Sequence, residues 1–419
     1  MKQFKLTLVT AMLLSVFITG CNEDTEYVHD VTTYNAYISE GNYTHQNDPS
    51  IKLTNLKSIN VMTYNMPNVK NQLSKVTALV MYPKAPKPKD GWRIVVWDHG
   101  TEGVGDACAP SNMALRPNFQ ILAESLLNAG YVIVAPDYEG LGTPGIHPYL
   151  HIKSEAYAAI YAVNAIQEKY KSDFNGQWMT AGQSQGGQAS LAAAEFANND
   201  LNYKGAVVAA PGSTFREIVL NASPAKFEAL EQDEIANNVA IENRKSVVAK
   251  ANLLTFTAFA AVGVKSYDSQ FDYNELFQER ARKLATSAEG TTGENGLCWA
   301  GLAQKFKDDI ILFLNENKDK TLKDYPGIDD EKFKNNYVFQ KFIDDNQPGT
   351  RRINTPVLVI QGTEDSIIPF KVTEKLVEQI SATGTNVTFL PVEGAEHTQA
   401  IVQKNDDVVA FIKAHMPAN

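Results

Sequence analysis

Short apolar runs alternate with longer helical patterns over much of the chain. Such runs are typical of strands that are buried on both faces of a sheet. After residue 91 they are WRIVVW at 92–97, YVIVA at 131–135, WMTA at 178–181, GAVVAA at 205–210 and PVLVIQ at 356–361. Helical patterns lie among them, for example at 118–129, 154–170 and 189–196. This alternation predicts an α/β fold with a mostly parallel central sheet of about eight strands and helices on both faces.

The alternation is interrupted between residues 213 and 350. This stretch has no convincing strand, and its helical patterns lie at 227–253, 274–287, 301–314 and 331–345. We therefore expect an α/β core made of residues 46–212 and 351–419. A helical cap over 213–350 is expected between the sixth and seventh strands of this core.

One apolar run in this insertion, at 251–264, has to be distinguished from a membrane span. It is shorter than the roughly 20 apolar residues that a spanning helix needs, and Thr255 and Thr257 interrupt it. We expect the run to form the core of the cap, because apolar runs usually pack inside a protein. One wall of an apolar pocket is the alternative.

The N-terminus has the pattern of an export signal. Lys2 and Lys5 precede a short apolar stretch that ends in Gly20-Cys21. The pattern resembles a bacterial lipoprotein signal peptide over 1–20, in which Cys21 is lipidated and becomes the mature N-terminus. A secretory signal with an incidental cysteine is the alternative. We expect an exported lipoprotein whose lipid anchors it to a membrane, and Asn22 after the cysteine favours the outer membrane over the inner membrane. A periplasmic or secreted protein is the alternative location. Residues 21–45 are expected to form an acidic tether.

Composition and charge limit the partners. The chain is 44% apolar and 21% charged, as expected for a soluble globular protein. Its net charge of −10 argues against a nucleic-acid partner and provides no basic patch for anionic lipids. Because an exported chain folds in an oxidising compartment, Cys108 and Cys298 are expected to form a disulfide. Two unpaired thiols are the alternative.

The strongest chemical motif is Gly182-Gln183-Ser184-Gln185-Gly186, which stands between a predicted strand and a predicted helix. Strand, G-x-S-x-G and helix together are the context of a nucleophile elbow, where a strained turn exposes a serine hydroxyl. Glycine is needed two residues before and two residues after the serine, because side chains there collide. An ordinary glycine-rich turn, in which the serine caps the helix, is the alternative.

A serine nucleophile needs a base and a group that orients the base. His397 is the best base, because it follows the last predicted strand on a loop before the final helix. Asp365, on the loop after strand 356–361, is expected to orient it, with Glu364 as the neighbour that competes for this role. Loops that leave the carboxyl ends of parallel strands converge there, and serine, acid and histidine occur in the α/β-hydrolase order.

Four other polar residues follow predicted strands and precede the serine. His147 and His151 are interpreted as possible lining of a pocket entrance, on the wrong side of Ser184 for the catalytic base. Asp137 and Glu139 are interpreted as structural groups that support the elbow or the entrance.

An acyl-transfer site also needs donors for the oxyanion. The backbone N–H of Gln185, directly after the serine, is one expected donor. The other is expected from the His99-Gly100-Thr101 loop, with the N–H of Thr101 as first choice and that of Gly100 as second.

Several blocks together resemble the secretory lipase family of α/β-hydrolases, which includes Candida antarctica lipase A. They are DHGTEGVGDACAPS, APDYEGLG, GQSQGG, QGTEDSIIP and EGAEH, and the resemblance covers about 90–212 and 350–415. It implies an α/β-hydrolase fold with a helical cap and carboxylic ester hydrolysis through an acyl-serine, with no metal or cofactor. The cap is the least similar part, so a chain-length preference does not follow from it.

The sequence therefore predicts a serine ester hydrolase, an esterase or lipase, that acts on a small-molecule or lipid ester. An acyltransferase or peptidase with the same three residues is the alternative within enzymes. A surface lipoprotein that binds a ligand without catalysis is the alternative outside them, although the presence of all three residues argues against it.

Overall fold

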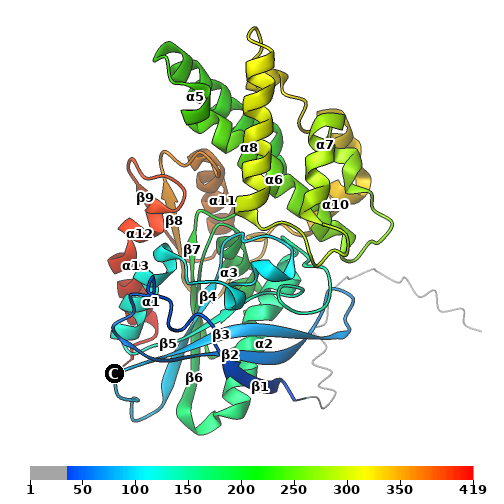
Figure 1. The fold of residues 1–419 in the computed structure, drawn as a ribbon. Helices are drawn as coiled ribbons and strands as arrows, with labels where there is room; N and C mark the ends of the chain where they lie inside the picture. Colours follow the sequence, from blue (N-terminus) through cyan, green and yellow to red (C-terminus); the bar gives the residue numbers. More distant parts are fainter. Residues whose placement is uncertain (1–34, 419) are drawn as a thin grey trace, which may run out of the picture. The chain divides into compact units, whose positions relative to one another are not determined.

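The structure is a computed structural model that describes residues 35–418. The predicted signal peptide, the predicted lipidation site Cys21 and the first part of the predicted tether lie outside the described residues. Within residues 35–418, a central sheet forms the base and a group of helices follows its seventh strand in the chain (Figure 1).

The sheet has nine strands in the order β1-β2-β3-β5-β4-β6-β7-β8-β9. The pairs from β1 to β5 are antiparallel, and the pairs from β5 through β4 to β9 are parallel. The strands are β1 Tyr37–Asn42, β2 Leu56–Pro67, β3 Leu73–Pro83, β4 Trp92–Asp98, β5 Val132–Pro136, β6 Phe174–Gln183, β7 Tyr203–Ala209, β8 Val357–Gly362 and β9 Val387–Val392. The predicted mostly parallel sheet is confirmed, and β4, β5 and β8 are buried along their whole length, as their apolar runs indicate.

The first strand differs from the expectation that residues 37–42 belong to the tether. In the structure these residues form β1, which pairs antiparallel with β2 at the edge of the sheet. Its sequence YISEGN has four exposed and two half-buried positions, so an edge strand of this kind carries no apolar signal. With β1 counted, the helical insertion lies between β7 and β8.

Helices cover both faces of the sheet, as predicted. On one face, α2 (Ile152–Lys169), α3 (Gln185–Phe196) and α11 (Phe370–Ala382) contribute to one buried cluster. On the other, α1 (Pro117–Asn128), α12 (Gln399–Gln403) and α13 (Asn405–His415) contribute to a second. Alternate residues of one strand point to opposite clusters: Val96 packs in the first and Val95 in the second.

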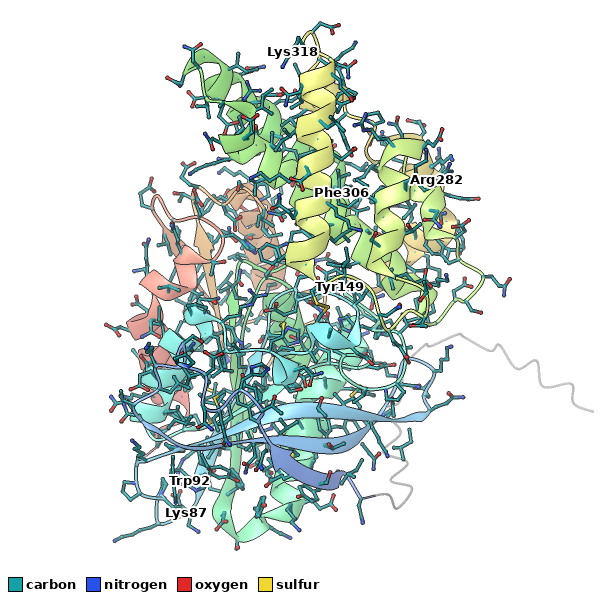
Figure 2. All side chains as sticks on the ribbon, viewed as in Figure 1. Lys87, Trp92, Tyr149, Arg282, Phe306 and Lys318 are labelled. Atoms are coloured by element: carbon teal, nitrogen blue, oxygen red, sulfur yellow. A yellow bond between two sulfur atoms is a disulfide. The ribbon has the colours of Figure 1, made fainter. Side chains whose placement is uncertain are left out.

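The insertion between β7 and β8 supplies most of a third apolar cluster, which includes the buried Phe306 (Figure 2). Its helices are α4 Phe215–Glu217, α5 Ser223–Ala236, α6 Lys245–Lys265, α7 Glu279–Ala285, α8 Trp299–Glu316, α9 Asp330–Asn335 and α10 Tyr337–Asp345. One expectation is wrong in detail, because the pattern at 227–253 is two helices. Asn238 at φ 55° follows the end of α5, and the chain turns before α6 begins.

Helix α6 contains the apolar run that we expected to form the core of the cap. By length and composition this helix is able to cross a membrane, but 83% of its most apolar window is buried inside the protein. Helices α5 and α8 pack against it, and it supplies many members of the third cluster. The core interpretation is therefore confirmed, and Phe256 also lines a cavity that Ser184 reaches.

Cys108 and Cys298 form the expected disulfide, with 5.3 Å between their Cα atoms. Cys108 lies in the segment after β4, and Cys298 is the N-cap residue of α8. The bond therefore joins the segment that follows the predicted oxyanion loop to the first turn of a cap helix.

Candidate active site

Ser184 stands alone between two regular elements. Strand β6 ends at Gln183 and helix α3 begins at Gln185, so the turn between them is a single residue. Its backbone has φ 63° and ψ −121°, a strained conformation for a residue with a side chain. The strand, turn and helix context that the motif requires is therefore present.

The two glycines of the motif are required by space. A Cβ atom on Gly182 lies 2.1 Å from the carbonyl oxygen of Gly186, and one on Gly186 lies 1.8 Å from that of Asp98. Real Cβ atoms do not approach backbone oxygens so closely. Glycine at both positions lets α3 start directly against the ends of β4 and β6.

The serine backbone is also held by hydrogen bonds. The N–H of Ser184 donates to the carbonyl of Ala209 at 2.9 Å, and the N–H of Gly212 donates to the carbonyl of Ser184 at 3.0 Å. Both partners lie at or just after the end of β7. The strained residue is thus fixed by the neighbouring parallel strand, as strain at a functional site requires.

Asp365 and His397 contact each other. The Nδ1 atom of His397 lies 2.8 Å from Oδ2 of Asp365, and Asp365 is buried. The competing carboxylate, Glu364, is exposed and forms an ion pair with Lys226. Of the two neighbours, Asp365 is the one that can orient the histidine.

The other ring nitrogen of His397 is available. Nε2 is buried and has no hydrogen-bond partner among residues 35–418. Since Nδ1 donates its proton to Asp365, the neutral ring presents Nε2 as an acceptor. This is the state that a general base needs, because catalytic hydrogen bonds often tighten only when substrate binds.

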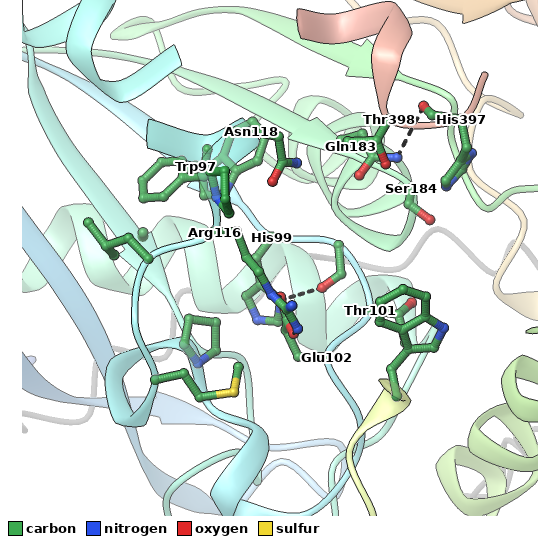
Figure 3. A pocket seen from close by; sticks show the side chains of 18 of the residues that line it. Trp97, His99, Thr101, Glu102, Arg116, Asn118, Gln183, Ser184, His397 and Thr398 are labelled. Atoms are coloured by element: carbon green, nitrogen blue, oxygen red, sulfur yellow. Dashed lines mark hydrogen bonds and ion pairs between the residues drawn. The ribbon is translucent and has the colours of Figure 1, made fainter. Parts of the chain in front are cut away.

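Ser184 and His397 line the same cavity, which has a volume of about 300 Å³ (Figure 3). Its wall is mostly apolar, with contributions from the end of β4, the start of α1 and the cap. Its lining includes Trp97, Gly100, Thr101, Glu102, Arg116, Asn118, Gln183, Phe256 and Trp299.

A second, smaller cavity of about 30 Å³ also reaches Ser184. Cap residues and the loop after β8 form it, and they include Phe227, Leu253 and Ile368. Phe256 and Ile367 line both cavities. Ser184 therefore lies where a larger and a smaller space meet.

The predicted oxyanion loop lies beside the serine. A Cβ atom on Gly100 comes within 3.2 Å of the carbonyl oxygen of Gln183 and 3.6 Å of the Ser184 Cβ, so this backbone approaches the elbow closely. The hydroxyl groups of Thr101 and Tyr149 lie 2.7 Å apart. Tyr149 in turn packs edge-on against Phe259 of α6, so a cap helix supports the loop.

The side chain of Gln185 belongs to a buried polar network beneath the elbow. Its Nε2 donates to Oε1 of Glu155 at 2.9 Å and lies 3.1 Å from Nε2 of His147. The Nδ1 atom of His147 lies 2.8 Å from the carbonyl oxygen of Glu139. Neutral His147 satisfies both contacts, with Nδ1 as donor and Nε2 as acceptor. The network fixes the residue whose backbone N–H is the first predicted oxyanion donor.

Burial sets the protonation of this network. Burial lowers the pKa of His147 to about 3, so its ring is neutral at pH 7. Burial also raises the pKa of Glu155 to about 8, and its Oε2 has no hydrogen-bond partner within residues 35–418. Both groups are uncharged at pH 7, as the apolar surroundings require.

The histidines and acids before the serine are therefore structural. His147 is buried, which corrects the interpretation that it lines an entrance, and His151 is the N-cap residue of α2. Asp137 accepts hydrogen bonds from Thr77 and from the N–H of Ser111. Glu139 accepts one from the Ser154 hydroxyl at 2.5 Å, so each acid holds neighbouring segments together, which is a structural role.

Sequence reasoning missed one pair of residues in the larger cavity. Arg116, just before α1, donates from Nε and Nη2 to the two carboxylate oxygens of Glu102 (Figure 3). The two residues are 14 positions apart in the chain, and no local pattern pairs them, so only the fold brings them together. The same holds for Glu155 and Gln185, which come from α2 and α3.

Comparisons with known proteins agree with this architecture. The sequence model of the secretory lipase family matches residues 117–234 and 309–418, more than half of the chain. A search of curated proteins gave no match.

Two similar solved structures are a rice cell wall degrading esterase, LipA from Xanthomonas oryzae, and Candida antarctica lipase A in its closed state. The first has 16% identity and a TM-score of 0.59, over 91% of this chain and 97% of the esterase. The second has 15% identity and a TM-score of 0.61, over 90% of this chain and 83% of the lipase. At these identities the likeness shows a shared fold. Together with the family match, it shows that this chain has the α/β-hydrolase fold and belongs to the secretory lipase family.

Proposed function

We propose that this protein is a carboxylic ester hydrolase in which Ser184, His397 and Asp365 form a catalytic triad. Family membership and the esterase and lipase neighbours support a hydrolase. The observation that carries the finer proposal is the arrangement of His397. One ring nitrogen contacts buried Asp365, while the other is a free acceptor in the cavity that Ser184 lines.

In the first half of the reaction, the Ser184 hydroxyl attacks the ester carbonyl carbon and His397 Nε2 takes its proton. The negative charge moves to the carbonyl oxygen, where the N–H groups of Gln185 and Thr101 are the proposed donors, with Gly100 as second choice for the latter. The bond to the alcohol oxygen then breaks, and His397 gives that oxygen its proton. The products are an acyl-serine and a free alcohol.

In the second half, water attacks the acyl-serine and gives a proton to His397. The acyl bond to Ser184 breaks, and the serine oxygen recovers the proton from His397. Asp365 holds the histidine in the correct tautomer and stabilises its charged form throughout. The net reaction converts an ester and water into an acid and an alcohol.

The two cavities suggest where the parts of the ester lie. The leaving oxygen must reach Nε2 of His397, which lines the larger cavity, so we place the alcohol part there. The acyl part then extends into the smaller cavity between the cap and the loop after β8. Its volume of about 30 Å³ fits a short acyl group and supports an esterase with a short-chain preference.

The test is hydrolysis of p-nitrophenyl esters whose acyl chains run from short to long, with Ser184→Ala as the control. We expect wild-type turnover far above the control, with an optimum at short chains. Wild-type turnover no greater than that of Ser184→Ala at every chain length contradicts the ester hydrolase. Turnover that rises with an added alcohol or amine acceptor, rather than with water alone, favours the acyltransferase alternative.

We also propose that the chain is exported and anchored through Cys21, with 213–350 acting as a cap domain over the core. The secretory family and the Cys108–Cys298 disulfide support export. Cys21→Ala is expected to move the protein from the membrane fraction to the soluble fraction. Membrane association that survives this change contradicts the lipid anchor.

A further inference from the structure

The ion pair of Arg116 and Glu102 is unusual for its position in a mostly apolar substrate cavity. The side chain of Glu102 is 9% exposed, and that of Arg116 is 45% exposed. Both residues line the larger cavity (Figure 3), and the guanidinium is the more exposed partner of the pair. Hydrogen bonding to Glu102 raises the pKa of Arg116 further, so the cation is permanent.

Glu102 uses only one edge of the guanidinium. Nε and one N–H of Nη2 donate to its two oxygens. A guanidinium has five N–H donors, and the remaining ones are on Nη1 and on the outer side of Nη2. Within residues 35–418, Nη1 has no protein acceptor. Arg116 therefore keeps a second, unused pair of parallel donors, the arrangement that binds a carboxylate through both oxygens.

The support of this side chain is rigid. The carbonyl oxygen of Glu102 accepts a hydrogen bond at 2.7 Å from the N–H of Trp299, at the start of α8. The next residue, Gly103, packs against the Cys108–Cys298 disulfide, since a Cβ there meets Cys108 Sγ at 2.7 Å. Because the acid is fixed, the guanidinium is presented at a defined place in the cavity.

An apolar alcohol group fits this cavity poorly at Arg116. Such a group displaces water from the free N–H groups of Arg116, which then have no acceptor. Burying charged donors without an acceptor is costly. A carboxylate in the same place accepts from both free donors. The charge of Glu102 offsets part of the attraction but also prevents an isolated cation.

We propose that Arg116 determines specificity by selecting esters whose alcohol part carries a carboxylate. The proposal rests on the ester hydrolase proposed above and on the placement of the alcohol part beside His397. Arg116 is a binding residue for the leaving group, and Glu102 is a positioning residue that acts through it.

The test uses acetate esters of ω-hydroxy acids of increasing chain length. Each is compared with the acetate ester in which a primary amide replaces the free carboxylate. It is also compared with an acetate ester of the same shape whose alcohol part is a hydrocarbon. We expect the wild-type kcat/KM for the best acid ester to exceed that for its hydrocarbon partner by about tenfold, as for a hydrogen-bonded charge. The preference should weaken as salt is added, because Arg116 is half exposed.

Arg116→Met is expected to abolish the preference for the acid ester over the hydrocarbon ester. Arg116→Lys keeps the charge but loses the paired N–H donors, so it should reduce the preference only in part. Arg352→Met is the matched control, because Arg352 is an exposed arginine elsewhere on the chain. Its ratio should equal that of the wild type.

Two results overturn the inference. One is a wild-type enzyme with no preference for the acid ester at any chain length. The other is an Arg116→Met variant that lowers kcat/KM for all three esters by the same factor, because such a uniform loss is a structural effect alone. Either result leaves the proposed function intact while p-nitrophenyl acetate is still hydrolysed faster by wild type than by Ser184→Ala. Loss of that difference contradicts the proposed function instead.

Discussion

The carboxylate of Asp365 accepts four hydrogen bonds, and one of them comes from His397. Its Oδ2 atom accepts from His397 Nδ1 and from Gln361 Nε2, each at 2.8 Å. Its Oδ1 atom accepts from the N–H groups of Ile367 and Ile368, at 2.8 and 2.9 Å. The acid is thus held by its own loop and by β8, independently of the histidine. The geometry of His397 follows from that of Asp365.

Asp365→Asn should therefore lower kcat strongly with little change in KM. The asparagine keeps the size of the side chain, but its amide no longer stabilises the charged histidine and favours the wrong tautomer. A loss of about 10³- to 10⁴-fold in kcat is typical of this change in a serine triad. Steady-state hydrolysis of p-nitrophenyl acetate measures it.

Glu364→Gln is the matched control for that variant. Glu364 is the adjacent carboxylate, but it is exposed and pairs only with Lys226 among the residues that the structure describes. Its kcat should stay within about twofold of the wild type, because an exposed ion pair contributes little. If both variants lose activity equally, or if Asp365→Asn keeps full activity, the assignment of the acid is wrong.

The buried acid Glu155 should make stability fall as pH rises. Its pKa is about 8 in the folded protein because of burial, against an ordinary value near 4.5. Between these values the folded state keeps a proton that the unfolded state has lost. The resulting stabilisation is complete at low pH and declines through this window, by about 1.4 kcal/mol for each pH unit.

Denaturant unfolding of the wild type and of Glu155→Gln, from about pH 5 to about pH 8, tests this linkage. Other buried acids, such as Asp98 and Glu139, contribute to both proteins, so the difference between the two isolates Glu155. We expect the wild type to lose stability relative to the variant as pH rises. A difference that stays constant across the range contradicts the raised pKa.

Local patterns predicted the parts of this site that depend on local geometry. Ser184 needed only a strand, a glycine-flanked turn and a helix, and these have local signals. Asp365 and His397 were singled out because they lie on loops that follow strands whose carboxyl ends meet at one edge of the sheet. The interrupted alternation of strands and helices indicated the cap, and the blocks that resemble the secretory lipase family added ester hydrolysis as the expected reaction.

The features that the sequence did not reveal depend on contacts between distant segments. Arg116 and Glu102 meet because the start of α1 turns towards the loop after β4, and Arg116 lies outside the blocks that resemble the family. Strand β1 is stabilised by pairing with β2, and its polar sequence carries no period of apolar residues. The uncharged state of Glu155 depends on burial, which only the packed fold supplies.

The Cys108–Cys298 disulfide should stabilise the fold and the catalytic loop together. It closes a sequence separation of 190 residues and joins the segment after the proposed oxyanion loop to α8. Replacement of both cysteines by serine is expected to cost about 2–5 kcal/mol in the free energy of unfolding. It should also lower kcat/KM, because Thr101 and Glu102 lie close to Cys108 in the chain.

Thermal unfolding with and without reductant checks this prediction. Reductant should lower the Tm of the wild type and leave that of the double serine variant unchanged. The folded wild type should release no thiols to a titrant until it is reduced. Two reactive thiols in the non-reduced protein rule out the bridge.

Phe256 of α6 should limit the length of the acyl chain. It is the cap residue that lines both the larger and the smaller cavity beside Ser184. Phe256→Ala removes the ring and connects the two spaces, so the p-nitrophenyl ester optimum should move to longer chains. Phe271→Ala provides the comparison, because this buried cap phenylalanine packs against Phe339. It should lower stability by about 3–5 kcal/mol without moving the optimum. An optimum that shifts equally in both variants means that general loosening of the cap, rather than Phe256 itself, sets the acyl length.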